Sequence, residues 1–369
     1  MRVAFRTDAS VQIGTGHVMR CLTLADELTR QGHECWFVCR EHDGHLGDLI
    51  ASKGYDLTLL PSPGNNEPDA NDRNSENYAL WLGVPQQDDA RQTLGPLKAW
   101  KPDWLVVDHY ALDAQWERSL ANAAGKIMVI DDLANRPHEC ALLLDQNLGR
   151  QAEDYCYLVP ECCQVLAGPR YALLRPEFRE WREASLSRRA RQPRLQRLLI
   201  NLGGVDKDNV TGQVLEALIT CDLPADLQIS VVMGASAPWR ESVAAQARVM
   251  PWSTEVVVNV SDMARRMTEA DLAIGAAGST SWERCCLGLP TLMVVLADNQ
   301  EASAKAMQKI DAANCIGQAA ALRDELPAKL EILSKSPLTL KSMTVSSAAI
   351  CDGSGAPHVA KIFLNIMGE

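Results

Sequence analysis

The sequence lacks the features that would place a protein in or across a membrane. No stretch of its 369 residues approaches the ~20 apolar residues that a membrane-spanning helix needs. The N-terminal residues run straight into a strand-like segment, 3–6, with neither the apolar core nor the cleavage site of a signal peptide. We therefore expect a cytoplasmic protein with no membrane partner.

An excess of positive charge is also missing. The chain has 36 Lys and Arg against 47 Asp and Glu, a net charge of −11. Because binding to nucleic acids depends on neutralising many phosphates, this balance argues against a nucleic-acid partner. A small anionic ligand is still compatible with it, since a local cluster of backbone N–H groups can bind phosphate on an acidic protein.

Metal-ligand and disulfide spacings are absent as well. The twelve cysteines form no C-x-x-C pair, which predicts reduced, buried thiols rather than a zinc site or a disulfide framework. Carboxylates and a histidine occur together at Asp108–Tyr110 and Asp131–Asp132, but no H-x-x-x-H or H-x-H pair accompanies them. We expect neither a metal nor another cofactor.

The chain does contain a repeated alternation of strand-like and helical segments. The apolar runs that read as strands are 3–6, 35–38, 57–60, 104–108 and 127–131 in the first half, and 198–202, 229–233, 271–274 and 291–295 in the second. Strand, turn and helix repeated in two halves predict an α/β protein with two Rossmann-like, doubly wound domains facing a cleft. Ligands of such sheets bind at the carboxyl ends of the strands.

The expected boundaries follow from composition. We predict an N-terminal domain over 1–180, a C-terminal domain over 195–345 and a helical tail over 346–369. The domain boundary is expected around 174–194, and the arginine-rich, Pro-interrupted stretch 182–197 is interpreted as a solvated linker, with a partner-binding patch as the alternative.

The first candidate motif is Gly14-Thr15-Gly16-His17, between the first strand and an amphipathic helix over 17–30. Two glycines let the backbone turn tightly at a helix N-terminus. A dinucleotide fingerprint is disfavoured, because its third glycine would fall at Met19. The helix dipole disfavours an imidazolium at His17 and so favours a neutral ring that can accept a proton. A histidine that only caps or packs is the alternative.

Three loops of the second half are candidates for binding phosphate and ribose. Gly203-Gly204 follows a strand, and Gly278-Ser279-Thr280 leads into a helix that we expect Ser or Thr to cap. Glu283 lies in the first turn or so of that helix, and Asn299-Gln300 follows the last core strand. The alternatives are a plain tight turn, a glutamate that complements the helix dipole, and ordinary loop polarity.

Together these segments resemble the UDP-2,4-diacetamido-2,4,6-trideoxy-β-L-altropyranose hydrolases of pseudaminic acid biosynthesis. The resemblance covers most of the chain and rests on ordered segments that share the family's spacing: Phe5–Asp8, Gly14–His17, Trp81–Gly83, Asp108–Tyr110, Asp145–Asn147, Gly168–Phe178, Leu202–Gly204 and Gly278–Arg284. It implies a fold similar to that of the glycosyltransferase-B enzymes and a place in flagellin glycosylation.

The resemblance also implies a role for each candidate residue. His17 would be the general base, Gly14 and Gly16 beside it would bind the substrate, and UDP would bind the C-terminal domain. The substrate-binding residues that it implies are Tyr78, Arg170 and Tyr171 at the sugar, Gly203, Gly204, Gly278, Ser279 and Thr280 near the diphosphate, Val260 to Met263 at the uracil, Glu283 at the ribose, and Asn299 and Gln300 near phosphate or sugar.

The reaction implied is C–O cleavage at the anomeric carbon with inversion, by a monomer acting on a UDP-sugar. Glycosidases need a carboxylic acid because an alkoxide leaves poorly, whereas UDP leaves as a stabilised anion, so a single base for water is enough. Three alternatives stay open: a UDP-sugar glycosyltransferase of the same fold, a hydrolysing NDP-sugar 2-epimerase, and a non-catalytic nucleotide-sugar sensor.

Overall fold

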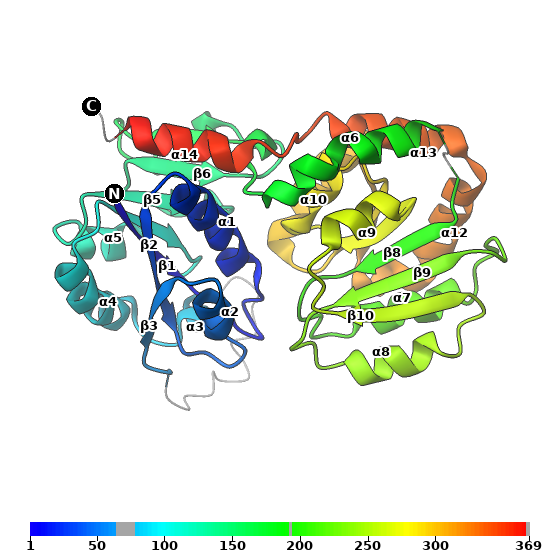
Figure 1. Ribbon diagram of the computed structural model, residues 1–369, viewed down its shortest axis with the longest axis horizontal. Helices are drawn as coiled ribbons and strands as arrows, with labels where there is room; N and C mark the ends of the chain where they lie inside the picture. The colour runs from blue at the N-terminus through cyan, green and yellow to red at the C-terminus, as the bar shows by residue number, and fades with distance from the viewer. Residues whose placement is uncertain (64–77, 192–193, 367–369) are drawn as a thin grey trace. The chain divides into compact units, whose positions relative to one another are not determined.

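The computed structural model describes residues 1–63, 78–191 and 194–366. The chain divides into two compact units, each described by itself below. Unit 1 comprises Met1–Leu173 and Gly355–Glu369, and unit 2 comprises Leu174–Ser354 (Figure 1). Among the described residues, no helix combines the length and apolar composition needed to cross a bilayer.

Unit 1 is built on a seven-stranded parallel sheet in the order β3-β2-β1-β4-β5-β6-β7. Its strands are β1 (Arg2–Thr7), β2 (Glu34–Arg40), β3 (Asp56–Leu60), β4 (Trp104–Asp108), β5 (Lys126–Ile130), β6 (Leu142–Asp145) and β7 (Gln164–Ala167). Its helices are α1 (Gly16–Arg30), α2 (Gly47–Ser52), α3 (Ala79–Leu82), α4 (Gln86–Trp100), α5 (Ala114–Leu120) and α14 (Gly355–Asn365), with 3-10 turns η1 (Ala152–Tyr155) and η2 (Pro169–Tyr171).

The core of unit 1 follows from two kinds of apolar pattern. The central strands are continuous apolar runs because helices cover both faces of the sheet; every residue of β4 is buried. Helix α1 places the predicted apolar face inward, with Val18, Cys21, Leu22, Leu24, Ala25 and Leu28 all buried. Helix α14 covers β4, where the ring of Phe363 stacks on Trp104 at 4.2 Å between centroids.

Unit 2 repeats this architecture with a six-stranded parallel sheet in the order β10-β9-β8-β11-β12-β13. Its strands are β8 (Arg197–Asn201), β9 (Gln228–Met233), β10 (Ser253–Val258), β11 (Leu272–Ala276), β12 (Thr291–Val295) and β13 (Asn314–Gln318). Its helices are α6 (Pro176–Arg191), α7 (Val210–Leu218), α8 (Arg240–Ala247), α9 (Met263–Glu269), α10 (Thr280–Cys286), α11 (Glu301–Lys309), α12 (Leu322–Lys335) and α13 (Pro337–Ala348), with η3 (Asp298–Gln300) and η4 (Ala319–Ala321).

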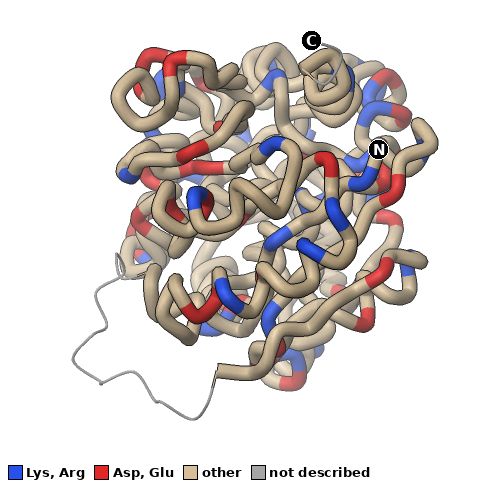
Figure 2. The backbone as a smooth tube through the Cα atoms, turned by 90° about the vertical axis from the view of Figure 1, so that its left-hand side faces the viewer, with Lys and Arg blue, Asp and Glu red and all other residues tan. Residues whose placement is uncertain are grey.

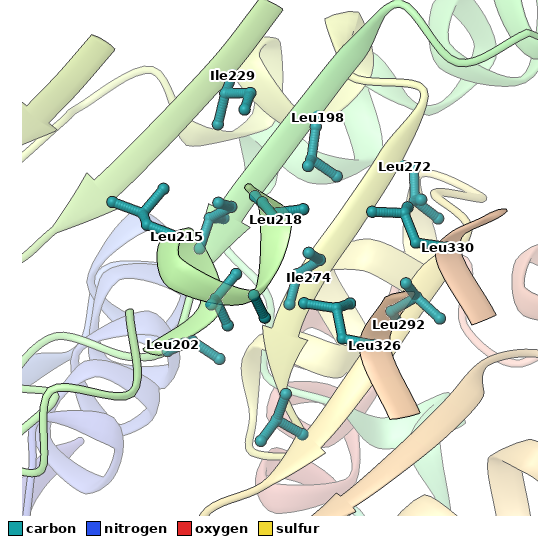
Figure 3. Packing of buried hydrophobic residues seen from close by; sticks show 14 of the residues in the cluster. Leu198, Leu202, Leu215, Leu218, Ile229, Leu272, Ile274, Leu292, Leu326 and Leu330 are labelled. Carbon is teal, nitrogen blue, oxygen red and sulfur yellow. The ribbon is translucent and has the colours of Figure 1, made fainter. Parts of the chain in front are cut away.

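Leucine and isoleucine side chains fill one face of this second sheet. Leu218 of α7 lies beside Leu198 of β8, and α12 directs Leu330 toward Leu272 of β11 (Figure 3). All of these side chains are at most 1% exposed. The two parallel sheets confirm the predicted α/β class with two Rossmann-like domains.

The predicted domain boundaries differ from the observed division in two places. Residues 182–191 are not a solvated linker, because they lie in α6, which belongs to unit 2. The Arg189 guanidinium donates to the backbone oxygens of Met267, Ala270 and Leu287. The tail is not a separate element either, because α14 packs on α1 and β4 of unit 1.

Lys and Arg are interspersed with Asp and Glu along the backbone in the view of Figure 2, with no long run of either colour.

The strand order indicates where a ligand would bind in each unit. In each unit the chain runs outward along one half of the sheet, as β1-β2-β3 or β8-β9-β10, and then continues on the other side from β4 or β11. Ligands of doubly wound sheets bind at this reversal, beyond the carboxyl ends of the two central strands.

Candidate active site

His17 stands at the reversal point of unit 1, at the start of α1. The loop after β1 is closed by a hydrogen bond of 2.8 Å from the Gly14 amide to the Ser10 carbonyl. Gly14 has φ +79°, a conformation that an L side chain rarely adopts. Helix α1 begins at Gly16, and its second residue is the histidine. The glycines therefore set where the imidazole lies.

Asp108, the last residue of β4, holds that imidazole. The Nδ1 atom of His17 lies 2.6 Å from Oδ1 of Asp108, which is fully buried. Burial raises the pKa of Asp108, but the charge of Arg20 and the hydrogen bonds from Arg20 and His17 outweigh it and hold the pKa well below its ordinary value. Because an ionised carboxylate only accepts hydrogen bonds, Nδ1 is the donor. The Nε2 atom then carries the free lone pair, and it has no hydrogen-bond partner within the described part of the chain.

Arg20 links the His17–Asp108 pair to a second carboxylate, that of Asp132. Its guanidinium donates to both oxygens of Asp108, at 2.6 and 2.7 Å, and to Oδ2 of Asp132 at 2.6 Å. The Tyr110 hydroxyl donates to the same Asp132 oxygen at 2.7 Å. We call His17, Arg20, Asp108, Tyr110 and Asp132 the His17 cluster. Sequence reasoning noted Asp108 and Asp132 only as motif pieces and missed their link through Arg20, one turn beyond His17.

Aromatic rings line one side of His17. Tyr110 meets the imidazole edge-on at 4.6 Å between centroids, and Trp81 lies beyond it at 6.4 Å. The predicted sugar residue Tyr78 contacts both of these rings, at 4.9 Å from Trp81 and 5.0 Å from Tyr110. The structure thus brings Tyr78 to the His17 cluster; residues 64–77, most of the loop that the sequence predicts over 61–77, lie outside the described residues.

Arg170 and Tyr171, also predicted to lie near the sugar, sit in η2. The Arg170 guanidinium lies over the Tyr171 ring at 4.5 Å. Among the described residues, neither side chain makes a hydrogen bond or ring contact with His17. The structure therefore pairs these two residues with each other but does not bring them to the His17 cluster.

The reversal point of unit 2 carries glycine loops. Gly203 has φ +96° and lies two residues after the end of β8. A Cβ on Gly234, at the end of β9, would lie 2.0 Å from the Gly204 carbonyl oxygen, so the two loops approach each other closely. This close approach leaves backbone groups, rather than side chains, at the carboxyl ends of β8 and β9.

The loop between β11 and α10 meets the segment after β12. A Cβ on Gly278 would lie 3.5 Å from Nε2 of Gln300, whose Oε1 accepts a hydrogen bond of 3.0 Å from the Leu296 amide. Asn299 lies in the same turn, η3. The expected Ser or Thr cap is wrong, because Ser279 is the N-cap residue and makes no side-chain capping bond. Its backbone is helical (φ −56°, ψ −29°) rather than the extended form of a capping serine.

Glu283 lies in α10 beside this loop. Arg175 lies 3.6 Å from its Oε1. Burial raises the pKa of Glu283 to about 7, although Arg175 and Arg284 act to lower it. We call Gly203, Gly204, Gly278, Ser279, Thr280, Glu283 and Gln300 the glycine-loop residues.

The predicted uracil segment lies between β10 and α9. Val260 is half-buried, Met263 is buried, and Asn259 before them has φ +53°. Both predicted residues thus follow the carboxyl end of a strand of the same sheet. Elsewhere in the described residues, no group of three His, Cys, Asp or Glu side chains is arranged to hold a metal ion.

Comparison with known proteins assigns the chain to a family. The chain is 30% identical to the spore coat polysaccharide biosynthesis protein SpsG of Bacillus subtilis, over 99% of this chain and 98% of that protein. It is 29% identical to the UDP-2,4-diacetamido-2,4,6-trideoxy-β-L-altropyranose hydrolase of Campylobacter jejuni, over 84% of this chain and 97% of that protein. This chain belongs to the same family as SpsG. The resemblance inferred from the sequence is confirmed.

The fold of this family member is that of the glycosyltransferase-B enzymes. Residues 205–359 match the glycosyltransferase family 28 C-terminal domain. The crystal structure of MurG from Acinetobacter baumannii superimposes with a TM-score of 0.69 at 18% identity, over 99% of each chain. The chain is thus an enzyme of the glycosyltransferase-B superfamily.

Proposed function

We propose that this chain hydrolyses a UDP-sugar to UDP and the free sugar, and that His17 activates the attacking water. One observation carries the proposal: His17 donates through Nδ1 to an ionised carboxylate, which leaves Nε2 as a proton acceptor. When Nε2 takes a proton from water, Asp108 stabilises the imidazolium that forms. The same arrangement positions the base and selects its tautomer.

The leaving group explains why one base is sufficient. UDP departs as a stabilised anion, so donors directed at its phosphates replace the acid that glycosidases need. In the proposed reaction Gly203, Gly204, Gly278, Ser279 and Thr280 bind the diphosphate, Glu283 the ribose hydroxyls, and the backbone around Val260 to Met263 the uracil. Asn299 and Gln300 contact phosphate or sugar.

The substrate that we propose is UDP-2,4-diacetamido-2,4,6-trideoxy-β-L-altropyranose, as named for the Campylobacter relative. Attack on the anomeric carbon opposite the nucleotide breaks the C1–O bond and inverts C1. Tyr78, with Arg170 and Tyr171, contacts the sugar. The enzyme acts in the cytoplasm as a monomer without a metal, within pseudaminic acid biosynthesis.

Hydrolysis in ¹⁸O-labelled water tests the position of attack. The label is expected on the sugar, read by mass spectrometry of both products; label in UDP would show attack at phosphorus. His17→Ala is expected to lose about 10²–10⁴-fold in rate, the range for removing a general base, while still binding UDP. Undiminished turnover by this variant would refute the assignment, and unchanged turnover in EDTA is expected of a metal-independent enzyme.

A UDP-sugar glycosyltransferase is the second candidate, and the match to the family 28 C-terminal domain favours it. The discriminating experiment incubates the enzyme with the UDP-sugar and no acceptor, and follows UDP by chromatography. Stoichiometric release of UDP and free sugar supports hydrolysis. Release that requires an added sugar or lipid acceptor supports the transferase.

A further inference from the structure

Arg284 is a buried cation that forms no salt bridge within the described part of the chain. It lies in α10 and is 2% exposed. Its guanidinium donates to the Ala276 carbonyl at 2.6 Å and to the hydroxyls of Ser281 and Thr280, each at 3.0 Å. Across residues 1–63, 78–191 and 194–366, no carboxylate forms a salt bridge with it, and its Nε has no hydrogen-bond partner.

Burying a charged side chain without a counter-charge costs free energy. Burial lowers the pKa of Arg284 to about 10, so the side chain still carries its charge at neutral pH. Removing a charge from water costs several kcal/mol or so unless another charge or a set of dipoles compensates. The backbone also makes room for it, because a Cβ on Gly275 would lie 2.5 Å from its NH1.

The partners of Arg284 show where its charge is directed. Thr280 is half-buried and is the first residue of α10, two residues after Gly278 of the loop that follows β11. Because Oγ1 of Thr280 accepts a hydrogen bond from the guanidinium, its own O–H proton must point elsewhere. The hydroxyl is thereby set up as a donor for an anion, polarised by the cation behind it.

We propose that Arg284 is a positioning residue for the nucleotide diphosphate, acting through the Thr280 hydroxyl and supplying positive charge behind it. This inference rests on the proposed UDP-binding function. It names the group that stabilises the leaving diphosphate in place of a metal ion or a general acid. A purely structural Arg284 would instead only tie α10 to the Ala276 carbonyl.

Paired titrations separate these roles. We expect Arg284→Met and Thr280→Val each to weaken UDP binding about 10- to 100-fold, as for loss of a hydrogen bond to a charged group, and to leave uridine binding unchanged. Arg284→Lys, which keeps the charge, should retain part of the affinity. Arg248→Met, an exposed arginine at the end of α8, is the matched control and should bind both ligands as the wild type does.

The measurement is the ratio of UDP to uridine affinity by calorimetry, on the full chain, with unfolding temperatures recorded for each variant. Should Arg284→Met fail to fold, Thr280→Val decides, because it removes only the hydroxyl. An unchanged ratio in Thr280→Val overturns the inference while wild-type UDP binding and hydrolysis leave the proposed function intact. A wild type that binds no UDP would overturn both.

Discussion

The carboxylate of Asp108 serves two side chains at once, the imidazole that it orients and the guanidinium that neutralises it. Replacing one of its oxygens by an amide lets an N–H face Nδ1 of His17. The imidazole would then accept at Nδ1 and carry its proton on Nε2, which is the wrong tautomer for a base. The residue thus controls which nitrogen can accept a proton from water.

Asp108→Asn should therefore lower the rate of hydrolysis about 10²–10⁴-fold, the range for loss of general-base catalysis. UDP affinity, measured by calorimetry, should stay within twofold because the nucleotide residues lie in unit 2. Asp88→Asn, at a carboxylate 46% exposed on α4, is the control and should turn over normally. Full activity in Asp108→Asn would contradict the role given to the pair.

Glu283 predicts a pH dependence of nucleotide binding. Its pKa is raised to about 7 by burial, so the carboxyl is largely protonated at pH 6 and ionised at pH 8. Only the ionised form accepts hydrogen bonds from both ribose hydroxyls, so UDP affinity should rise as pH increases through 7, by about tenfold from pH 6 to pH 8. In Glu283→Gln, the pH dependence that comes from the phosphates of UDP itself should remain, and the additional dependence that comes from the Glu283 carboxyl should disappear. Parallel slopes for wild type and variant would exclude the ribose role.

Some of the site was accessible from the sequence and some was not. The glycine pairs and His17 could be recognised from neighbouring residues alone, because each lies beside the end of a predicted helix or strand. The pairing of His17 with Asp108 spans 91 residues and depends on β4 lying next to β1. A strand order of 3-2-1-4, assumed from the doubly wound pattern, would have brought the ends of β1 and β4 together. The link from Asp108 to Asp132 through Arg20 could not be predicted in this way, because it depends on side-chain geometry.

At the level of elements, most of the buried apolar strands were predicted, as was the partly exposed β3, and four other strands were missed. The first and central strands, such as β1 and β4, are continuous apolar runs because both faces are covered. The missed strands are β6, β7, β10 and β13. The two edge strands of unit 2, β10 and β13, have partly exposed residues, and β6 and β7 have four residues each, too few for a period to show.

Helix α14 depends on a glycine at its first residue. A Cβ on Gly355 would lie 2.1 Å from the carbonyl oxygen of Ala172, a backbone atom that cannot rotate away. We expect Gly355→Ala to destabilise the protein by about 1–3 kcal/mol, as overpacking does, measured by denaturant unfolding. Gly95→Ala is the matched control, because nothing lies within 4 Å of its added Cβ and it sits inside α4. That variant should be neutral or stabilised by up to about 1 kcal/mol.

For the molecule as a whole, unit 1 is assembled from two distant parts of the chain, and unit 2 lies between them in sequence. The sequence predicted 346–369 only as a separate helical tail, because nothing in these residues indicates which sheet they pack on. The stacking of Phe363 on Trp104 is a contact across 259 positions of sequence, and its energy comes from burial that only the folded chain provides.

A chain that stops at Ser354 should therefore be weakened in unit 1 alone. Loss of α14 exposes Trp104, so amide exchange should accelerate in β4 and β5 and stay unchanged in β8 and β11, as read by mass spectrometry. Equal acceleration in both sheets would show that the tail supports the molecule as a whole. UDP binding by the shortened chain provides an independent check of unit 2.

This arrangement also decides the order in which a ribosome delivers the fold. The strands of unit 1 up to β7 emerge first, and the whole of unit 2 is synthesised before α14 appears. Until then the nascent first sheet has an uncovered apolar face at Trp104, a surface prone to association during translation. The part of the enzyme that carries the histidine is begun first and completed last.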